Sequence, residues 1–203
     1  MNVRNELAKK LANENSSLRI DKFIKQCLHE KNSYYTDHNP IGKDYDFVTA
    51  PEISQMFGEI IGLYILNYWL TKIGSRFNLI ELGPGKGTLL KDILRVSKIN
   101  NQFIKNAKIT LIDKNIKLIK LQKKVINSFD IKNVKWKEKF HLNSCLPSIV
   151  YSNEFFDCFA IRQFYKKKYW LEKYVKYNFD ENQFSLFEKI VTEKKIKKEL
   201  LKY

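Results

Sequence analysis

The segment from residue 79 to residue 88, LIELGPGKGT, constrains the fold of this chain more than any other. An apolar run with the pattern of a β-strand ends in an acidic residue, and a helix-like segment, 88–96, begins directly after the turn. Between them stand three glycines at alternate positions: Gly83, Gly85 and Gly87. Strand, glycine turn and helix in this order bring a sheet's backbone close to a nucleotide-like ligand, because glycine has no side chain to block the approach. We therefore predict a ligand-binding turn in preference to an ordinary tight connection.

The spacing of these glycines narrows the class of ligand. The pattern is G-x-G-x-G, whereas dinucleotide-binding enzymes have G-x-G-x-x-G. A P-loop is excluded because Lys86 precedes Gly87 instead of following it, and because the four-residue gap between glycines is missing. A ligand without phosphates, such as S-adenosylmethionine, fits this turn at least as well as a nucleotide.

The chain after residue 76 alternates between strands and helices. The predicted strands cover 77–82, 109–112, 134–136 and 149–151, with helices at 88–96 and 116–128. Such alternation predicts a parallel, doubly wound sheet of the Rossmann-like α/β class, with the fourth strand beside the first. After residue 161 the pattern changes to two antiparallel strands, 163–179 and 183–191, and a lysine-rich helix is expected from residue 193.

A long helix is predicted over residues 50–73, and Gly74 provides a natural C-terminal stop. Thr49 is the expected N-cap, and Glu52, three residues later, completes a capping box. The two positions of a hydrophobic staple hold Val48 and Ile53. This helix therefore has its own structural reason to begin where it does.

The N-terminal part of the chain has a different character from the alternating part. Residues 18–28 have apolar positions at helical spacing, and 34–45 contains an Asn-Pro pair and a glycine typical of a loop. We predict an N-terminal helical cap region at 1–75 and a partial Rossmann-like ligand-binding domain at 76–203 that ends in a β-hairpin.

Two acidic residues end predicted strands. Glu81 could orient the glycine turn or reach an ammonium group of the ligand, and a solvated carboxylate at a strand end is the simpler alternative. Asp113 ends the second strand, where an acidic residue can accept hydrogen bonds from both ribose hydroxyls. Asp113 also suits the N-cap of the following helix, and we favour ribose binding.

A third acidic group follows the fourth strand in the sequence NEFFD, residues 153–157. Ligands of doubly wound sheets bind beyond the carboxyl ends of the strands, so Glu154 is expected to face the glycine turn. Its carboxylate could pair with a guanidinium in bidentate geometry or draw off a proton during methyl transfer. Glu154 and Asp157 are therefore the candidate catalytic residues, with a turn carrying incidental acids as the alternative.

The composition limits the function without deciding it. A net charge of +15 permits nucleic-acid binding, but the lysines are spread from Lys9 to Lys202 and are typical of solvated faces. Three cysteines without a C-x-x-C pair argue against a disulfide framework and a zinc site. Residues 1–17 lack a secretory pattern, and the apolar run 60–70 is too short to cross a bilayer. We expect a cytoplasmic protein without a metal.

Three blocks of the sequence together resemble one family. Residues 46–59 read DFVTAPEISQMFGE, 81–88 read ELGPGKGT, and 153–157 read NEFFD with an Arg-Gln pair close behind. These blocks are similar to those of the S-adenosylmethionine-dependent methyltransferases related to the mitochondrial complex I assembly-factor arginine methyltransferase, which has many bacterial relatives. The resemblance runs from about residue 20 to about residue 191.

The resemblance implies a class I methyltransferase fold with an N-terminal helical part over the cofactor, in a bacterial protein. The glycines would hold the methionine part of S-adenosylmethionine, Asp113 the ribose, and residues 49–55, with Thr49 and Glu52, would help to close the site. The implied activity is methylation of a protein arginine, with a subunit of respiratory complex I as the substrate.

This chain departs from the family in several places. Ser33 and Tyr45 stand where the family usually has glycine, and Lys114 and Asn115 replace a serine-proline pair. Family members are also much longer, so we expect an incomplete sheet whose fourth strand is an open edge, with the hairpin covering part of the gap. The alternatives to an active enzyme are half of a split methyltransferase completed by a separately encoded C-terminal half, a non-catalytic truncated remnant, and a nucleic-acid-binding protein.

Overall fold

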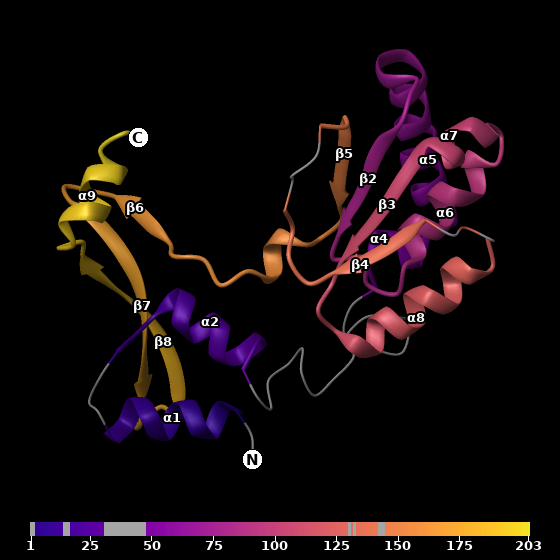
Figure 1. Ribbon diagram of the computed structural model, residues 1–203. Coiled ribbons are helices and arrows are strands. Elements are labelled where there is room, and N and C mark those ends of the chain that lie inside the picture. Colours follow the sequence, from indigo (N-terminus) through magenta and orange to yellow (C-terminus); the bar gives the residue numbers. More distant parts are fainter. Residues whose placement is uncertain (1–2, 14–16, 31–47, 130, 132, 142–144) are drawn as a thin grey trace. The chain divides into compact units, whose positions relative to one another are not determined.

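The computed structural model describes residues 3–13, 17–30, 48–129, 131, 133–141 and 145–203. The chain divides into two compact units (Figure 1). Residues 1–40 and 156–203 form the first unit, and residues 41–155 form the second. The predicted functional division into 1–75 and 76–203 stays a prediction, and the two units are described separately below.

A four-stranded parallel sheet organises the second unit. Its strands are β2 (Phe77–Leu82), β3 (Ala107–Ile112), β4 (Val134–Lys137) and β5 (Ser148–Ser152), in the order β4-β3-β2-β5. In the register of the sheet, Leu79 pairs with Ile109 on one side and with Ile149 on the other. The parallel α/β class and the place of the fourth predicted strand beside the first are thereby confirmed.

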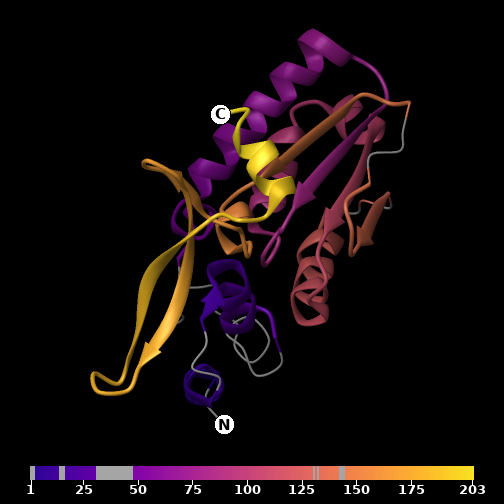
Figure 2. The same ribbon diagram turned by 90° about the vertical axis from the view of Figure 1, so that its left-hand side faces the viewer.

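The helices of this unit are α4 (Ala50–Ile53), α5 (Gln55–Tyr68), the π-helical turn η1 (Trp69–Ile73), α6 (Thr88–Ser97), α7 (Asn101–Asn106) and α8 (Ile116–Asn127). The large core cluster joins α5, η1, α6, α7 and α8 to one face of the sheet, where Phe77 and Leu79 of β2 lie fully buried. Figure 2 shows α5 alongside the sheet. A smaller cluster of Ile80, Leu82 and Ile112 occupies the opposite face, with Phe155 against it.

The predicted helix over 50–73 is interrupted. Ser54 has extended backbone angles, φ −141° and ψ 119°, and therefore separates α4 from α5. The last turn widens into a π-helix, and Gly74 ends it in the left-handed conformation with φ 64°. The predicted stop at Gly74 is thus confirmed, whereas the prediction of one continuous helix is wrong.

Close approach of α5 to α6 depends on two glycines one turn apart on α5. A Cβ added to Gly58 would lie 2.6 Å from Asp92 Cβ, and one added to Gly62 would lie 2.9 Å from the Cα of Ile93. Neither distance is possible for a real side chain, so these two positions fix how closely the helices pack.

The first unit is an antiparallel sheet with helices. It contains α1 (Val3–Asn13), β1 (Leu18–Arg19), α2 (Ile20–Leu28), η2 (Phe156–Cys158), β6 (Phe164–Lys166), β7 (Trp170–Asn178), β8 (Gln183–Ile190) and α9 (Lys194–Leu200). The predicted hairpin is confirmed, because β7 and β8 pair with Tyr174 opposite Phe187. In this unit β7 also pairs with β6 and β1, and the expectation that the hairpin covers part of the gap beside the fourth strand stays a prediction.

Charge pairing stabilises the interior of this antiparallel unit. Arg162 binds the buried Glu172 in bidentate geometry, with Nε 2.6 Å from Oε1 and Nη2 2.8 Å from Oε2. Arg162 also donates to Glu193, at 2.8 Å, directly before α9. The pair of Arg162 and Glu172 explains how a carboxylate can be buried in the sheet without a large loss of stability.

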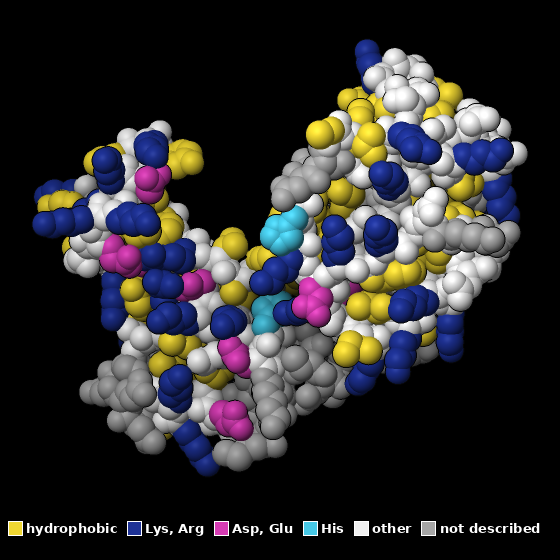
Figure 3. All heavy atoms as spheres, viewed as in Figure 1, with side chains coloured by type: hydrophobic (Ala, Val, Ile, Leu, Met, Phe, Trp, Pro, Cys, Tyr) yellow, Lys and Arg dark blue, Asp and Glu magenta, His cyan; other side chains and the backbone are white. Residues whose placement is uncertain are grey.

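The predicted loop at 34–45, with Ser33 and Tyr45, lies outside the described residues, as does the start of the 46–59 block. Among the helices that the structure does describe, none combines the length and the apolar character needed to cross a membrane. Figure 3 shows lysine and arginine side chains scattered over the visible surface of both units.

Candidate functional site

The turn after β2 has the geometry that glycine permits. Gly83, Gly85 and Gly87 have φ angles of 64°, 54° and 88°, all in the left-handed region. The Gly83 amide donates to the carbonyl of Ile112 on β3, at 3.1 Å. A Cβ on Gly83 would lie 2.4 Å from Cδ2 of Phe155, so both the backbone angle and the space exclude a side chain there. The Phe155 ring therefore packs directly against the main chain of the turn, at the carboxyl end of the sheet.

A pocket opens beside this turn within the second unit. It is lined by Thr49, Pro51, Glu52, Glu81, Gly83, Pro84, Gly85, Lys86, Thr88, Leu89, Asn153 and Glu154. Most of the residues predicted from the sequence therefore come together around one cavity. Gly87 and Asp113 are outside that lining, and Asp113 follows the neighbouring strand β3.

The contacts of Glu52 differ from the predicted capping box. No side-chain hydrogen bond caps α4 at Thr49, whose carbonyl instead accepts the Glu52 amide at 2.8 Å. The Glu52 carboxylate accepts a hydrogen bond from the Thr88 hydroxyl and lies 3.6 Å from Lys86 Nζ. Ile53, at the predicted staple, is 71% exposed. The prediction of a capping box is wrong because the carboxylate has stronger partners on the glycine turn.

Glu81 is buried, which overturns the alternative of a solvated strand-end carboxylate. Its side chain is 3% exposed, and Oε2 accepts a hydrogen bond from the Tyr151 hydroxyl on β5 at 3.2 Å. Burial raises the pKa of Glu81 to about 8, and the hydrogen bond from Tyr151 opposes that rise. A cation placed in the pocket beside Glu81 would favour its ionised form.

Asp113 is held by two donors, one on each carboxylate oxygen. Oδ1 accepts the Asn115 amide at 2.9 Å, and Oδ2 accepts Nε2 of Gln122 at 2.8 Å. The N-cap of α8 is Asn115, whose side chain accepts the amides of Lys117 and Leu118. The alternative that Asp113 caps this helix is therefore wrong, and its remaining lone pairs leave ribose binding as its predicted role.

Gln122 is the residue of the site that sequence reasoning missed. It is fully buried on α8 and donates to Gly85 O at 2.7 Å as well as to Asp113. A signal exists in the sequence, because Gln122 stands three residues after Ile119 and four before Ile126, on the apolar face of the helix. A polar side chain at such a position needs partners in the fold.

The two candidate catalytic residues belong to different units. Glu154 follows β5, lines the pocket and has a positive φ of 47°, which is uncommon outside glycine and is found preferentially at functional sites. Asp157 is exposed in the short helix η2 of the first unit. The catalytic roles of both residues remain predictions.

The lining of the pocket fits a cationic ligand without phosphates. Among the described residues around it are the carboxylates of Glu52, Glu81 and Glu154, and one basic residue, Lys86, which lies near Glu52. The left-handed backbone angles of the three glycines favour residues without a side chain at the turn beside the pocket. S-Adenosylmethionine carries an ammonium and a sulfonium and no phosphate, so the residues present suit it. Fold and pocket together define a Rossmann-like α/β protein with a candidate site for an adenosyl ligand at the end of β2.

Comparison with known proteins gives the family. The model described as "Putative S-adenosyl-L-methionine-dependent methyltransferase" matches residues 60–203, which is more than half of the chain. The chain therefore belongs to this family, and the relationship and cofactor predicted from its sequence are confirmed.

Several relatives agree with this assignment. The mitochondrial protein arginine methyltransferase NDUFAF7 of Bos taurus is 42% identical over 96 residues, which are 46% of this chain and 22% of the bovine protein. The human protein is 38% identical over 109 residues, covering 52% of this chain and 25% of its own length. A "likely methyl transferase" from Burkholderia thailandensis, solved with S-adenosyl-homocysteine, superposes with a TM-score of 0.76 at 19% identity. That match covers 98% of this chain and 52% of the Burkholderia chain, so this chain spans about half the length of that protein.

Proposed function

We propose that the chain acts in S-adenosylmethionine-dependent methylation of a protein arginine, with a subunit of respiratory complex I as the substrate, in the cytoplasm of a bacterium. The arginine chemistry is supported by the identity to the NDUFAF7 arginine methyltransferases, and the substrate by the sequence resemblance alone. The observation that carries the proposal is the pocket that brings Glu154 and the glycine turn together.

Five of the residues predicted from the sequence have proposed tasks. The turn at Gly83 and Gly85 offers bare main chain to the methionine part, and the buried Glu81 pairs with its ammonium group. Asp113 accepts the ribose hydroxyls. When bound, the cofactor supplies an electrophilic methyl group on sulfonium sulfur. Glu154 would bind the substrate guanidinium, hold one nitrogen toward the methyl group and take up the proton that this nitrogen releases, and rate enhancement would come mainly from this positioning.

Binding and catalysis can be tested separately. Isothermal titration of the full chain with S-adenosylhomocysteine is expected to give saturable heat, and Asp113→Ala is expected to weaken binding by about tenfold or more, as loss of hydrogen bonds to a charged group implies. Glu154→Gln should bind this ligand normally and lose methyl transfer to an arginine peptide. Absence of binding by the unchanged protein would overturn the proposal and favour a non-catalytic remnant.

A second candidate is that the chain works as half of a methyltransferase with a separately encoded C-terminal half. The observation that favours it is the outer edge of β5, where Val150 is 41% exposed and β2 is the strand partner among the described strands. An open edge of this kind is suited to pairing with another strand. Co-expression with the product of an adjacent reading frame should then raise methyl transfer, whereas equal activity with and without it would contradict this candidate.

The nucleic-acid-binding alternative rests on net charge. The basic side chains visible in Figure 3 are distributed and do not form one patch, and the described pocket is lined by three acidic residues and one basic residue among twelve. These observations support the methyltransferase proposal over that alternative.

A further inference from the structure

We propose that Gln122 is a positioning residue that makes the site selective for ligands with two free ribose hydroxyls. The inference rests on the proposed cofactor site. Gln122 lies on α8, and its side-chain amide donates hydrogen bonds both to the turn after β2 and to the residue after β3. It would act on the ligand through Asp113.

The orientation of the Gln122 amide is determined by its partners. The indole Nε1 of Trp136 on β4 lies 3.0 Å from Gln122 Oε1, and an indole N–H can only donate. The oxygen must therefore face Trp136, which directs the NH₂ group to the opposite side. There both of its hydrogens are used, on Gly85 O at 2.7 Å and on Asp113 Oδ2 at 2.8 Å. No other assignment of oxygen and nitrogen satisfies all three contacts.

This arrangement fixes the plane of the Asp113 carboxylate. Gln122 holds Oδ2, and the Asn115 amide holds Oδ1, so rotation of the carboxylate would break one of two hydrogen bonds. Each carboxylate oxygen has about two lone-pair sites, so one on each remains for a ligand. Two acceptors fixed side by side suit two neighbouring hydroxyl donors, which a ribose has and a deoxyribose lacks.

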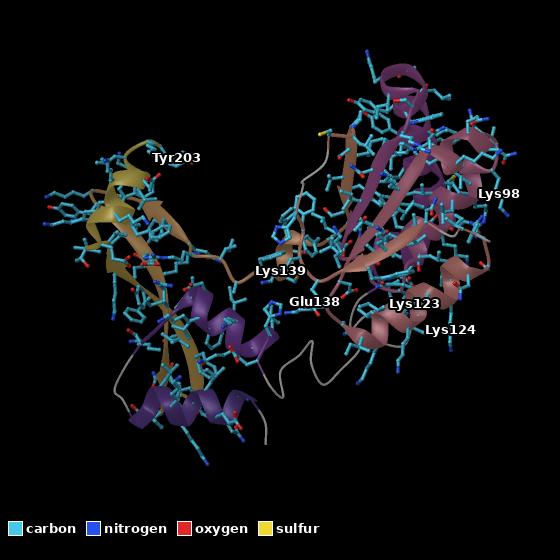
Figure 4. The ribbon with its side chains drawn as sticks, viewed as in Figure 1. Lys98, Lys123, Lys124, Glu138, Lys139 and Tyr203 are labelled. Atoms are coloured by element: carbon cyan, nitrogen blue, oxygen red, sulfur yellow. The ribbon has the colours of Figure 1, made fainter. Side chains whose placement is uncertain are left out.

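Trp136 completes the chain of contacts. Lys123, labelled on α8 in Figure 4, lies with Nζ 5.3 Å from the centroid of the Trp136 ring. Three segments are thus coupled through one buried amide: the glycine turn after β2, Asp113 after β3, and Trp136 within β4. A change at residue 122 should therefore alter the recognition of the ribose in particular.

The experiment compares two ligands by isothermal titration with the full chain: S-adenosylhomocysteine and its 2′,3′-dideoxy analogue. The unchanged protein should prefer the first by about tenfold or more. Gln122→Met keeps the length of the side chain and removes its donors, and it should reduce this preference to less than about threefold while the analogue binds as before. Trp136→Phe, which keeps an aromatic ring but frees the amide to turn, should reduce the preference in the same direction.

Several outcomes would overturn the proposal. If Gln122→Met weakens both ligands equally, Gln122 supports the fold and not the recognition of ribose. If Gln122→Met fails to fold, an unchanged preference in Trp136→Phe would contradict the proposal on its own. Absence of binding of either ligand by the unchanged protein would overturn the proposed cofactor site itself, and that result is distinct from binding with an unaltered ratio.

Discussion

The hydroxyl of Thr88 donates a hydrogen bond to the carboxylate of Glu52, which lies 36 residues earlier in the chain. Thr88 is the first residue of α6 and follows the last glycine of the turn, while Glu52 belongs to the four-residue helix α4. Lys86, inside the turn, lies 3.6 Å from the other oxygen of the same carboxylate. One side chain of α4 therefore fixes both the turn and the start of the helix behind it.

The first prediction concerns this contact. Glu52→Ala and Thr88→Val should each lower the free energy of unfolding by about 1–2 kcal/mol, because a partly buried hydrogen bond to a charged group is lost. The loss of stability in the double variant should be smaller than the sum of the two single losses by about 1 kcal/mol, because both changes remove the same hydrogen bond. Urea unfolding of the four proteins measures this coupling. Glu6→Ala, which removes an exposed carboxylate in α1, should change stability by less than about 0.5 kcal/mol. Strict additivity would contradict the contact.

The second prediction separates two costs at Gly83. Gly83 and Gly74 have the same φ of 64°, but only Gly83 has a neighbour, Phe155, where a Cβ would stand. Gly74→Ala should therefore cost about 1–2 kcal/mol for the backbone angle alone. Gly83→Ala should cost a further ~1–3 kcal/mol for overpacking against the ring.

Chemical denaturation of both variants tests this difference. The variant Phe155→Leu replaces the ring with a smaller side chain. In that background, Gly83→Ala should lower the free energy of unfolding by less than it does in the unchanged chain. Equal losses in Gly74→Ala and Gly83→Ala would show that the Phe155 ring moves aside without cost.

The elements of the parallel sheet could be predicted because each depends on local pattern. β2 was expected at 77–82 and is Phe77–Leu82, since a short apolar run followed directly by the glycine turn marks this strand in the sequence. The break at Ser54 could not be predicted in this way. It depends on how α4 meets the glycine turn through Glu52, a contact between residues far apart in the sequence.

The candidate site was predicted in part for the same reason. Glycines and strand-end acids are recognisable by type and position, and the pocket lining contains Gly83, Glu81 and Glu154. Gln122 was missed because its importance comes from three partners on three different loops and strands. The pairing of β7 with β1 was not predicted, because it joins segments separated by most of the chain.

The third prediction concerns the crossing of α5 and α6. In an ordinary helix, replacing glycine by alanine gains about 0.5–1 kcal/mol. At Gly62 the sign should be reversed, because the added Cβ would lie 2.5 Å from Val96 Cγ2 and 2.9 Å from a backbone atom of Ile93. We expect Gly62→Ala to lower the free energy of unfolding by about 1–3 kcal/mol. Asn67→Ala, on the exposed side of the same helix, should raise the free energy of unfolding by roughly a few tenths of a kcal/mol. A stabilised Gly62→Ala would show that the two helices can separate freely.

The fourth prediction concerns the pH dependence that Glu81 contributes. Burial raises the pKa of Glu81 from 4.5 to about 8 in the folded chain. Between these values the folded state retains a proton that the unfolded state has lost, so stability is fully present below pH 4.5 and falls as the pH rises toward 8. The loss should be at most about 1.4 kcal/mol per pH unit within this window. Glu81→Gln, which keeps the shape and cannot ionise, should lack this component.

Urea unfolding at about pH 5, 6, 7 and 8 covers the window in which the folded chain retains the proton. It measures the difference in the free energy of unfolding between Glu81→Gln and the unchanged chain. The stability of Glu81→Gln relative to the unchanged chain should rise with each step in pH, because only the unchanged chain releases a proton on unfolding in this window, and that release becomes more favourable as the pH rises. Glu6→Gln, at an exposed position, should run parallel to the unchanged chain. Parallel curves for Glu81→Gln as well would mean that Glu81 is already ionised in the folded protein, with Tyr151 and the open pocket supplying enough stabilisation for its charge.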